Sequence, residues 1–92
     1  MDFFTEIKKL ALGLLERQQP FEFKKLYEGY QIWVIEDDYS VWDAICHGGS
    51  YGHEKGLLEI RGHKYVGNDD VEGDLTAEEI LRRYDKEHGK DN

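Results

Sequence analysis

A run of four apolar residues near the middle of the chain constrains the fold more than any other feature. Within residues 30–36, YQIWVIE, positions 32 to 35 are Ile, Trp, Val and Ile. Successive side chains of a strand point to opposite faces of a sheet, so this segment is apolar on both faces. We therefore predict that it is a central strand.

The segments on either side predict an antiparallel sheet around this strand. Residues 22–27, EFKKLY, are rich in β-forming side chains, and Glu28-Gly29 supplies a two-residue hairpin loop. On the other side, Asp37-Asp38 supplies a turn into residues 39–47, YSVWDAICH. The alternation in this third strand assigns its side chains to two faces: Trp42, Ala44 and Cys46 on one, and Val41, Asp43, Ile45 and His47 on the other.

A glycine-rich stretch then leads to the last strand that the pattern predicts. Residues 48–56, GGSYGHEKG, read as a wide hairpin loop in which glycines supply positive φ angles. Residues 57–62, LLEIRG, predict the fourth strand. Residues 62–74 have weak periodicity and predict a loop, with at most one short strand near Val71.

Both ends of the chain predict helices. In residues 2–20, apolar side chains recur at helical spacing, Asp2 can cap the start, and Pro20 disfavours helix just before it. Near the C-terminus, Thr76 and Glu79 form a capping box, and Gly89 supplies a stop. The prediction is one α+β domain over residues 1–92, with a four-stranded antiparallel sheet in the order α-β-β-β-β-α.

Charge is spread unevenly along the chain. The net charge is −8, yet residues 1–35 sum to zero, with five acids against five bases. Two stretches hold acids without Lys or Arg: Glu36, Asp37, Asp38, Asp43 and Glu54 in residues 36–54, and Asp69, Asp70, Glu72, Asp74, Glu78 and Glu79 in residues 69–79. Such a field repels nucleic acid and attracts basic surfaces.

We therefore expect a partner with a basic surface and no direct binding of nucleic acid or membrane. The predicted contact residues are Asp37, Asp38, Asp69, Asp70, Glu72, Asp74, Glu78 and Glu79, together with Tyr51 and His53 at the tip of the glycine-rich loop. The alternative interpretation of the acids is solubility and helix capping. Neither pattern implies a cofactor.

Cys46, His47, His53 and His63 raise the alternative of a metal site or a thiol enzyme. Adjacent Cys46 and His47 point to opposite faces of a strand, so they cannot both reach one ion without a bulge. The acidic surroundings raise the pKa of a thiol, which makes it a poor nucleophile. The glycine-rich loop matches neither phosphate-binding fingerprint and leads into a strand. We therefore predict no catalytic residue and no metal ligand.

The sequence has one cysteine, no N-terminal segment that resembles a signal peptide, and no apolar run long enough to span a membrane. We therefore expect the protein in the cytoplasm.

The segments SVWDAICHGGSYGHEKGLLEI and VEGDLTAEEI resemble small uncharacterised proteins carried by phages and conjugative elements of Gram-positive bacteria. The resemblance covers roughly residues 30 to 84 and implies a mobile-element context. In that context small acidic proteins are often inhibitors of host defence, including anti-CRISPR proteins. The function that it implies is a non-catalytic nucleic-acid mimic that blocks a basic nucleic-acid-binding surface of a host nuclease or regulator. The alternatives are a Cys/His module at residues 46–53 and an accessory module that oligomerises through its sheet.

Overall fold

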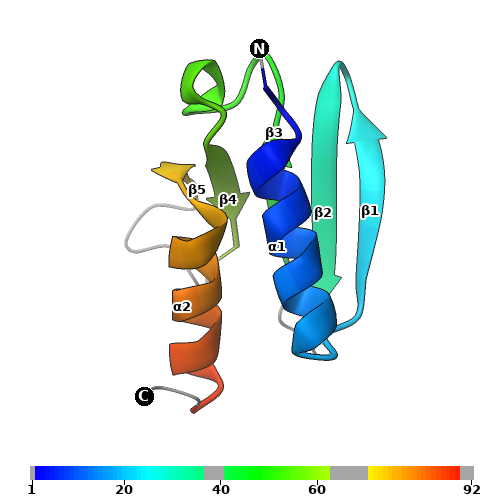
Figure 1. Ribbon diagram of the computed structural model, residues 1–92, viewed down its shortest axis with the longest axis vertical. Coiled ribbons are helices and arrows are strands. Elements are labelled where there is room, and N and C mark those ends of the chain that lie inside the picture. The colour runs from blue at the N-terminus through cyan, green and yellow to red at the C-terminus, as the bar shows by residue number, and fades with distance from the viewer. Residues whose placement is uncertain (1, 37–40, 63–70, 90–92) are drawn as a thin grey trace.

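Five antiparallel strands form one sheet, and each strand pairs with the strand that follows it in the chain (Figure 1). The computed structural model describes residues 2–36, 41–62 and 71–89. The elements in order are α1 (Thr5–Glu16), β1 (Phe21–Leu26), β2 (Gly29–Ile35), β3 (Val41–Cys46), the 3₁₀ turn η1 (His53–Lys55), β4 (Leu58–Arg61), β5 (Val71–Leu75) and α2 (Ala77–Glu87).

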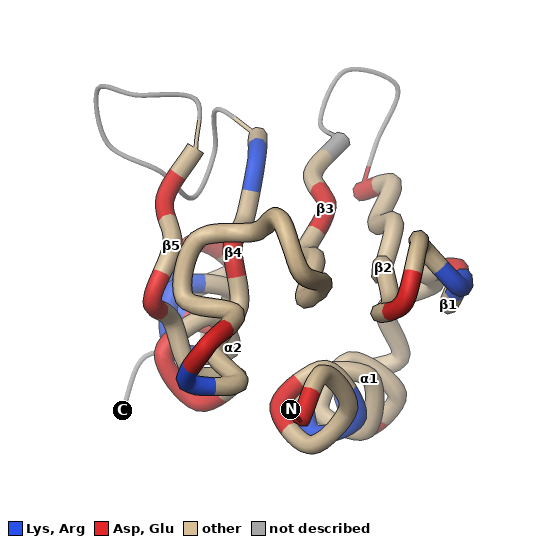
Figure 2. Tube along the Cα trace, turned by 90° about the horizontal axis from the view of Figure 1, so that it is seen from above, with Lys and Arg blue, Asp and Glu red and all other residues tan. Residues whose placement is uncertain are grey.

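Both helices lie against the same face of the sheet, as the view from above shows (Figure 2). The core between them is one cluster: Ile7, Leu10, Leu14, Ile32, Val34, Trp42, Ala44, Cys46, Leu58, Ile60, Leu75, Ala77, Ile80 and Tyr84. Trp42, Ala44 and Cys46 share this core face, as the alternation predicts. Asp43 and Ile45 point to the other face, where they are only 4% and 5% exposed.

The fold class and the two helices are confirmed, but four strands were the wrong number. The segment Val71–Leu75, VEGDL, forms β5 and pairs with β4, with Arg61 opposite Val71 and Leu58 opposite Leu75. Gly and Asp have low β propensity, so local sequence gives little sign of this strand. Its pairing with β4 overrides that preference.

The hairpin between β1 and β2 also differs from the prediction. Leu26 pairs with Gly29, so the two loop residues are Tyr27 and Glu28, not Glu28 and Gly29. Tyr27 takes the positive φ angle, 53°. Gly29 belongs to the strand, where a Cβ would lie 1.9 Å from the carbonyl oxygen of Cys46. The glycine is therefore needed for a close approach between β2 and β3.

The helix starts follow the sequence closely. Thr76 caps α2, and the reciprocal bonds of the capping box with Glu79 are both present. Asp2 lies two residues before Phe4, the N-cap of α1, and its carboxylate accepts from the backbone N–H groups of Phe4 and Thr5. At the start of each helix, side chains therefore bind backbone N–H groups that have no partner within the helix.

Contacts between α1 and α2 join the two ends of the described chain. Arg17 donates to both oxygens of Asp85, at 2.7 and 2.8 Å. The hydroxyl of Tyr84 donates to Gln19 Oε1 at 2.7 Å. The helices pack closely because Gly13 leaves room for the Leu81 side chain, whose Cδ1 would lie 2.3 Å from a Cβ at that position.

Candidate functional site

The glycine-rich segment between β3 and β4 is a structured loop. Ser50 is buried; its Oγ accepts from the backbone N–H of His47 at 3.0 Å and donates to the carbonyl of His47 at 2.9 Å. The backbone N–H of Tyr51 donates to the buried carboxylate of Glu59 at 2.8 Å. These bonds hold the loop on β4 and leave the side chain of Tyr51 68% exposed at its tip.

Two glycines of this loop have the positive φ angles expected of them. Gly52 has φ 92° and Gly56 has φ 71°, and they flank η1. A Cβ on Gly52 would also lie within 3.0 Å of three atoms of Asp74. The loop thus rests against the end of β5, and the backbone N–H of Asp74 donates to the carbonyl of Tyr51 at 3.4 Å.

Cys46 lies in the core, where its thiol donates to the carbonyl of Leu57 at 3.4 Å. Burial, with smaller effects from the Asp2 and Glu6 carboxylates, raises the pKa of Cys46 from 9.0 to about 11. The thiolate is the nucleophilic form of cysteine, and a raised pKa disfavours it. This thiol therefore has the properties of a small core side chain and not those of a nucleophile.

The histidines near Cys46 are bound elsewhere. His47 Nδ1 accepts from the backbone N–H of Gly49 at 2.9 Å, and its ring meets Tyr27 edge-on at 5.2 Å. His53 Nδ1 lies 2.6 Å from the carbonyl of Ser50. Within residues 2–36, 41–62 and 71–89, no group of three or more His, Cys, Asp or Glu side chains could hold a metal ion.

Both helices begin at the same end of the molecule (Figure 1). Carboxylates from four segments lie at this end, which we call the acidic end: Asp2, Glu6, Glu54, Asp74 and Glu78. Asp2, Glu6 and Glu54 line one shallow pocket of about 290 Å³ together with Lys55. Glu6 also reaches across to α2, where its Oε1 accepts from the backbone N–H of Ala77 at 2.8 Å. That bond places the first turn of α2, which carries Glu78, beside the first turn of α1.

The strand count explains why these charges meet. An odd number of antiparallel strands between two helices on one face makes the helices run in the same direction, and Figure 1 shows both descending from the same end. With four strands, α2 would run the opposite way and its acidic start would lie far from that of α1. Helix N-termini favour negative charge, so both starts can accommodate acids.

The pKa of the Asp2 carboxyl is lowered by its hydrogen bonds. Hydrogen bonds from the Thr5 hydroxyl, then from the backbone N–H groups of Thr5 and Phe4, lower the pKa of Asp2 from 3.8 to about 2. The charge at this position therefore persists far below neutral pH. Asp2, Glu6 and Glu54 were missing from the predicted contact residues. The signal that could have found Asp2 and Glu6 is that both lie at a helix start, and Glu54 belongs to the acidic stretch 36–54.

The predicted contact residues divide into three groups. Asp74 and Glu78 are exposed at the acidic end, with Tyr51 and the half-buried His53 on the adjoining loop. Glu72 instead pairs with Arg83 at 2.9 and 2.6 Å, which lowers the pKa of Glu72, and Glu79 belongs to the capping box. Asp37, Asp38, Asp69 and Asp70, like His63, lie outside the described residues.

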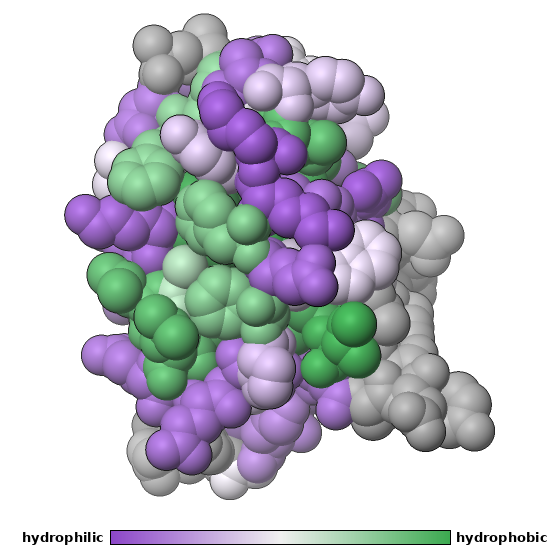
Figure 3. Space-filling model, turned by 90° about the vertical axis from the view of Figure 1, so that its right-hand side faces the viewer, coloured by the Kyte–Doolittle hydropathy of each residue, from purple (hydrophilic) through white to green (hydrophobic). Residues whose placement is uncertain are grey.

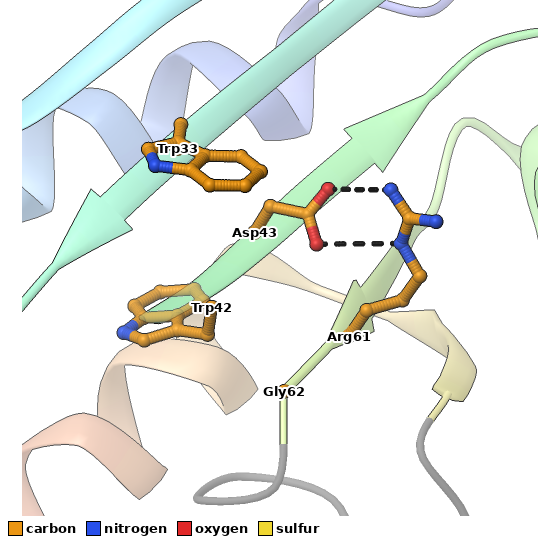
Figure 4. Close-up of a pocket in the computed structure, with 5 residues that line it drawn as sticks. All are labelled: Trp33, Trp42, Asp43, Arg61 and Gly62. Carbon is orange, nitrogen blue, oxygen red and sulfur yellow. Dashed lines mark hydrogen bonds and ion pairs between the residues drawn. The ribbon is translucent and has the colours of Figure 1, made fainter. Parts of the chain in front are cut away.

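A second pocket lies on the sheet face that the helices leave uncovered (Figure 4). It measures about 360 Å³ and is lined by Trp33, Trp42, Asp43, Arg61 and Gly62. Asp43 is 4% exposed and accepts from Arg61 Nη2 at 2.9 Å, from Arg61 Nε at 3.3 Å and from Gln31 Nε2 at 2.8 Å. The Asp43 hydrogen bonds and charge raise the pKa of Arg61. Asp43 thus neutralises the guanidinium charge. Trp33 supplies the aromatic wall on this face, because the Trp42 side chain belongs to the core and is only 2% exposed.

Neither α1 nor α2, the helices of the described residues, is long and apolar enough to cross a membrane. No protein-family model matches the chain, and no curated protein or solved structure matches it either.

Proposed function

We propose that this chain is a non-catalytic binding protein that docks its acidic end on a basic protein surface. In line with the resemblance noted above, its target would be the nucleic-acid-binding surface of a host nuclease or regulator. The observation that supports this most is the convergence of Asp2, Glu6, Glu54, Asp74 and Glu78 at one end of the fold.

Such an end can act as a substitute for a nucleic-acid backbone. A basic channel attracts an array of negative charges and releases its own counterions when it binds one, as it does with phosphates. The hydrogen-bonded loop beside the acidic end adds Tyr51, an exposed aromatic side chain of the kind that contributes most to interfaces. Binding should therefore weaken steeply as salt rises.

The Cys/His alternative has less support. A metal or thiol site needs ligand atoms or a nucleophile that converge, whereas Cys46, His47 and His53 bind different backbone groups. The raised pKa of Cys46 also opposes thiolate formation at neutral pH.

The test compares two double variants with the same net charge. Glu54→Gln with Glu78→Gln removes two charges from the acidic end, and Glu16→Gln with Glu87→Gln removes two from the last residues of the helices, at the opposite end. Each takes the net charge from −8 to −6, since −8 + 2 = −6. Differences between the two variants then report position and not total charge.

A tagged protein captures partners from a Gram-positive host lysate at low and at moderate salt, and each captured protein is purified for competition against a fluorescent oligonucleotide. We expect the wild type and the Glu16/Glu87 variant to displace the oligonucleotide, and the Glu54/Glu78 variant to bind with a salt slope shallower by about 2. Equal competition by both variants, or capture of a partner whose oligonucleotide binding is untouched, would contradict the proposal.

A further inference from the structure

β1 is an edge strand, and no described segment pairs with its outer side. In Figure 1 it forms the outermost strand of the sheet, on the side away from α2. Four of its six residues are exposed. An uncovered strand edge presents unpaired backbone N–H and C=O groups that another chain can bind.

Apolar side chains surround this edge. Figure 3, which views the molecule from the β1 side, shows them gathered on this face. The large exposed apolar residues of α1, its N-cap and β1 are Phe4, Leu12, Leu15 and Phe23, which are 44%, 50%, 61% and 41% exposed. The rings of Phe4 and Phe23 lie 6.3 Å apart, and both meet Tyr30. An apolar surface beside an open strand edge is typical of a protein interface.

The hairpin register determines which backbone groups point to the free edge. Leu26 and Gly29 close a two-residue loop, and the closing pair of such a loop is hydrogen-bonded. Hydrogen-bonded pairs alternate along an antiparallel ladder, so Lys24 and Glu22 also bond inward to β2. Phe21, Phe23 and Lys25 therefore direct their N–H and C=O groups outward.

We propose that β1 pairs with β1 of a second copy of this chain in an antiparallel, two-fold symmetric dimer centred on Phe23. In this register Glu22 lies opposite the partner's Lys24, and Lys24 lies opposite the partner's Glu22, because a two-fold axis repeats each contact. Within one chain the Glu22 carboxylate and the Lys24 ammonium group lie 3.3 Å apart, and their side chains are 65% and 49% exposed. The dimer would therefore exchange this ion pair within each strand for two ion pairs across the axis.

Charge selects this register over its neighbours. A shift of the two-fold axis by one residue along the strand places Glu22 opposite the partner's Glu22, or Lys24 opposite the partner's Lys24. Like charges directly opposite each other destabilise a strand pair, whereas opposite charges stabilise it. Lysines on an edge strand usually prevent pairing, but here Lys24 meets a carboxylate and Lys25 lies over the ring of Tyr30 at 5.1 Å.

The dimer would bury the apolar surface as well as the strand edge. A two-fold axis perpendicular to the sheet keeps both pairs of helices on one face of a continuous sheet. It brings Phe23 next to the partner's Phe23 and turns the Leu12 and Leu15 flank of α1 toward its copy. This proposal does not depend on the function of the acidic end.

A charge swap tests the register without touching the core. Glu22→Lys and Lys24→Glu each place like charges opposite one another, and the double variant restores opposite charges with the order reversed. Light scattering on a sizing column, at up to about 100 μM protein, measures the mass. We expect a dimer for the wild type and the double variant and a monomer for each single variant, with circular dichroism unchanged. A monomeric wild type, or single variants that remain dimeric, would overturn the proposal.

A cysteine pair tests the position of the axis. Phe23→Cys places its thiol opposite its own copy, within disulfide reach, whereas Lys25→Cys on the same side of the strand is offset from its copy by four residues, about 14 Å. Under mild oxidation the first variant should crosslink to a dimer on a non-reducing gel and the second should not. Cys46 stays buried in both. Equal crosslinking of the two variants would refute the register.

Discussion

Replacing Gly29 with alanine tests the close approach between β2 and β3. The new Cβ would lie 1.9 Å from the carbonyl oxygen of Cys46 and 2.8 Å from its carbonyl carbon, and these are backbone atoms that cannot rotate away. Carbon and oxygen normally stay at least about 3.3 Å apart, so the strands must separate at the pair formed by Tyr30 and Cys46.

The cost follows from the groups that this separation exposes or leaves unpaired. Hydrogen bonds contribute about 1 kcal/mol each, and a buried group left unpaired costs about 1–3 kcal/mol. Alanine offsets up to about 1 kcal/mol through the lower backbone entropy of its unfolded chain. We therefore expect Gly29→Ala to lower the free energy of unfolding by about 3 kcal/mol, measured by urea denaturation as a midpoint at least about 1 M lower.

Gly89→Ala is the matched control. Gly89 has a positive φ of 73°, but a Cβ there would meet no atom within 4 Å. Its substitution should therefore cost only the conformational preference of glycine, about 1 kcal/mol. If Gly29→Ala destabilised the protein no more than Gly89→Ala, the steric argument would be refuted.

Two further substitutions concern buried groups. Because burial raises the pKa of Cys46 to about 11, the stability that its neutral thiol contributes should be complete below pH 9 and should decline as the pH rises toward 11. The Cys46→Ser variant should not show this decline. The prediction would be contradicted if the thiol of the native protein were alkylated as fast as the thiol of the urea-unfolded chain. Tyr84→Phe removes the hydroxyl that binds Gln19 Oε1, and because both residues are at most 9% exposed, we expect the free energy of unfolding, measured by thermal denaturation, to fall by about 1–3 kcal/mol. The control Tyr27→Phe, at a residue that is 78% exposed, should change it by less than about 0.5 kcal/mol. Equal effects of the two variants would rule out the buried hydrogen bond as the cause.

The elements that could be predicted from the sequence are those that local interactions specify. The capping box of Thr76 and Glu79 needs only residues three apart, and the alternation at Trp42, Ala44 and Cys46 needs only one strand. β5 depends on pairing with β4, and its own composition disfavours a strand. Long-range pairing therefore decided β5, where the sequence predicted a loop with at most one short strand near Val71.

The candidate site, like the fold, was predictable only in the features that local sequence specifies. The acidic run that ends in Glu78 and Glu79 was visible, but local sequence could not show that Arg83 binds Glu72. Nor could it show that Asp2 and Glu6 lie beside the start of α2, because that depends on the direction of α2 and hence on the number of strands. The wrong strand count and the omission of Asp2 and Glu6 therefore have one cause.

Because each strand pairs with its neighbour in the chain, contacts within the sheet join residues closer in sequence than the contacts between the two helices do. Neighbouring strands are joined by connections of two to eleven residues, which cost less loop entropy than contacts between the two ends of the chain. The bonds between the helical ends instead join residues 65 to 71 positions apart: Gln19 with Tyr84, Arg17 with Asp85, and Glu6 with Ala77. We therefore expect the sheet to form early in folding and α2 to dock on α1 late. A ligand that binds the N-terminal ends of both helices would therefore stabilise the contact between α1 and α2 and slow the first step of unfolding.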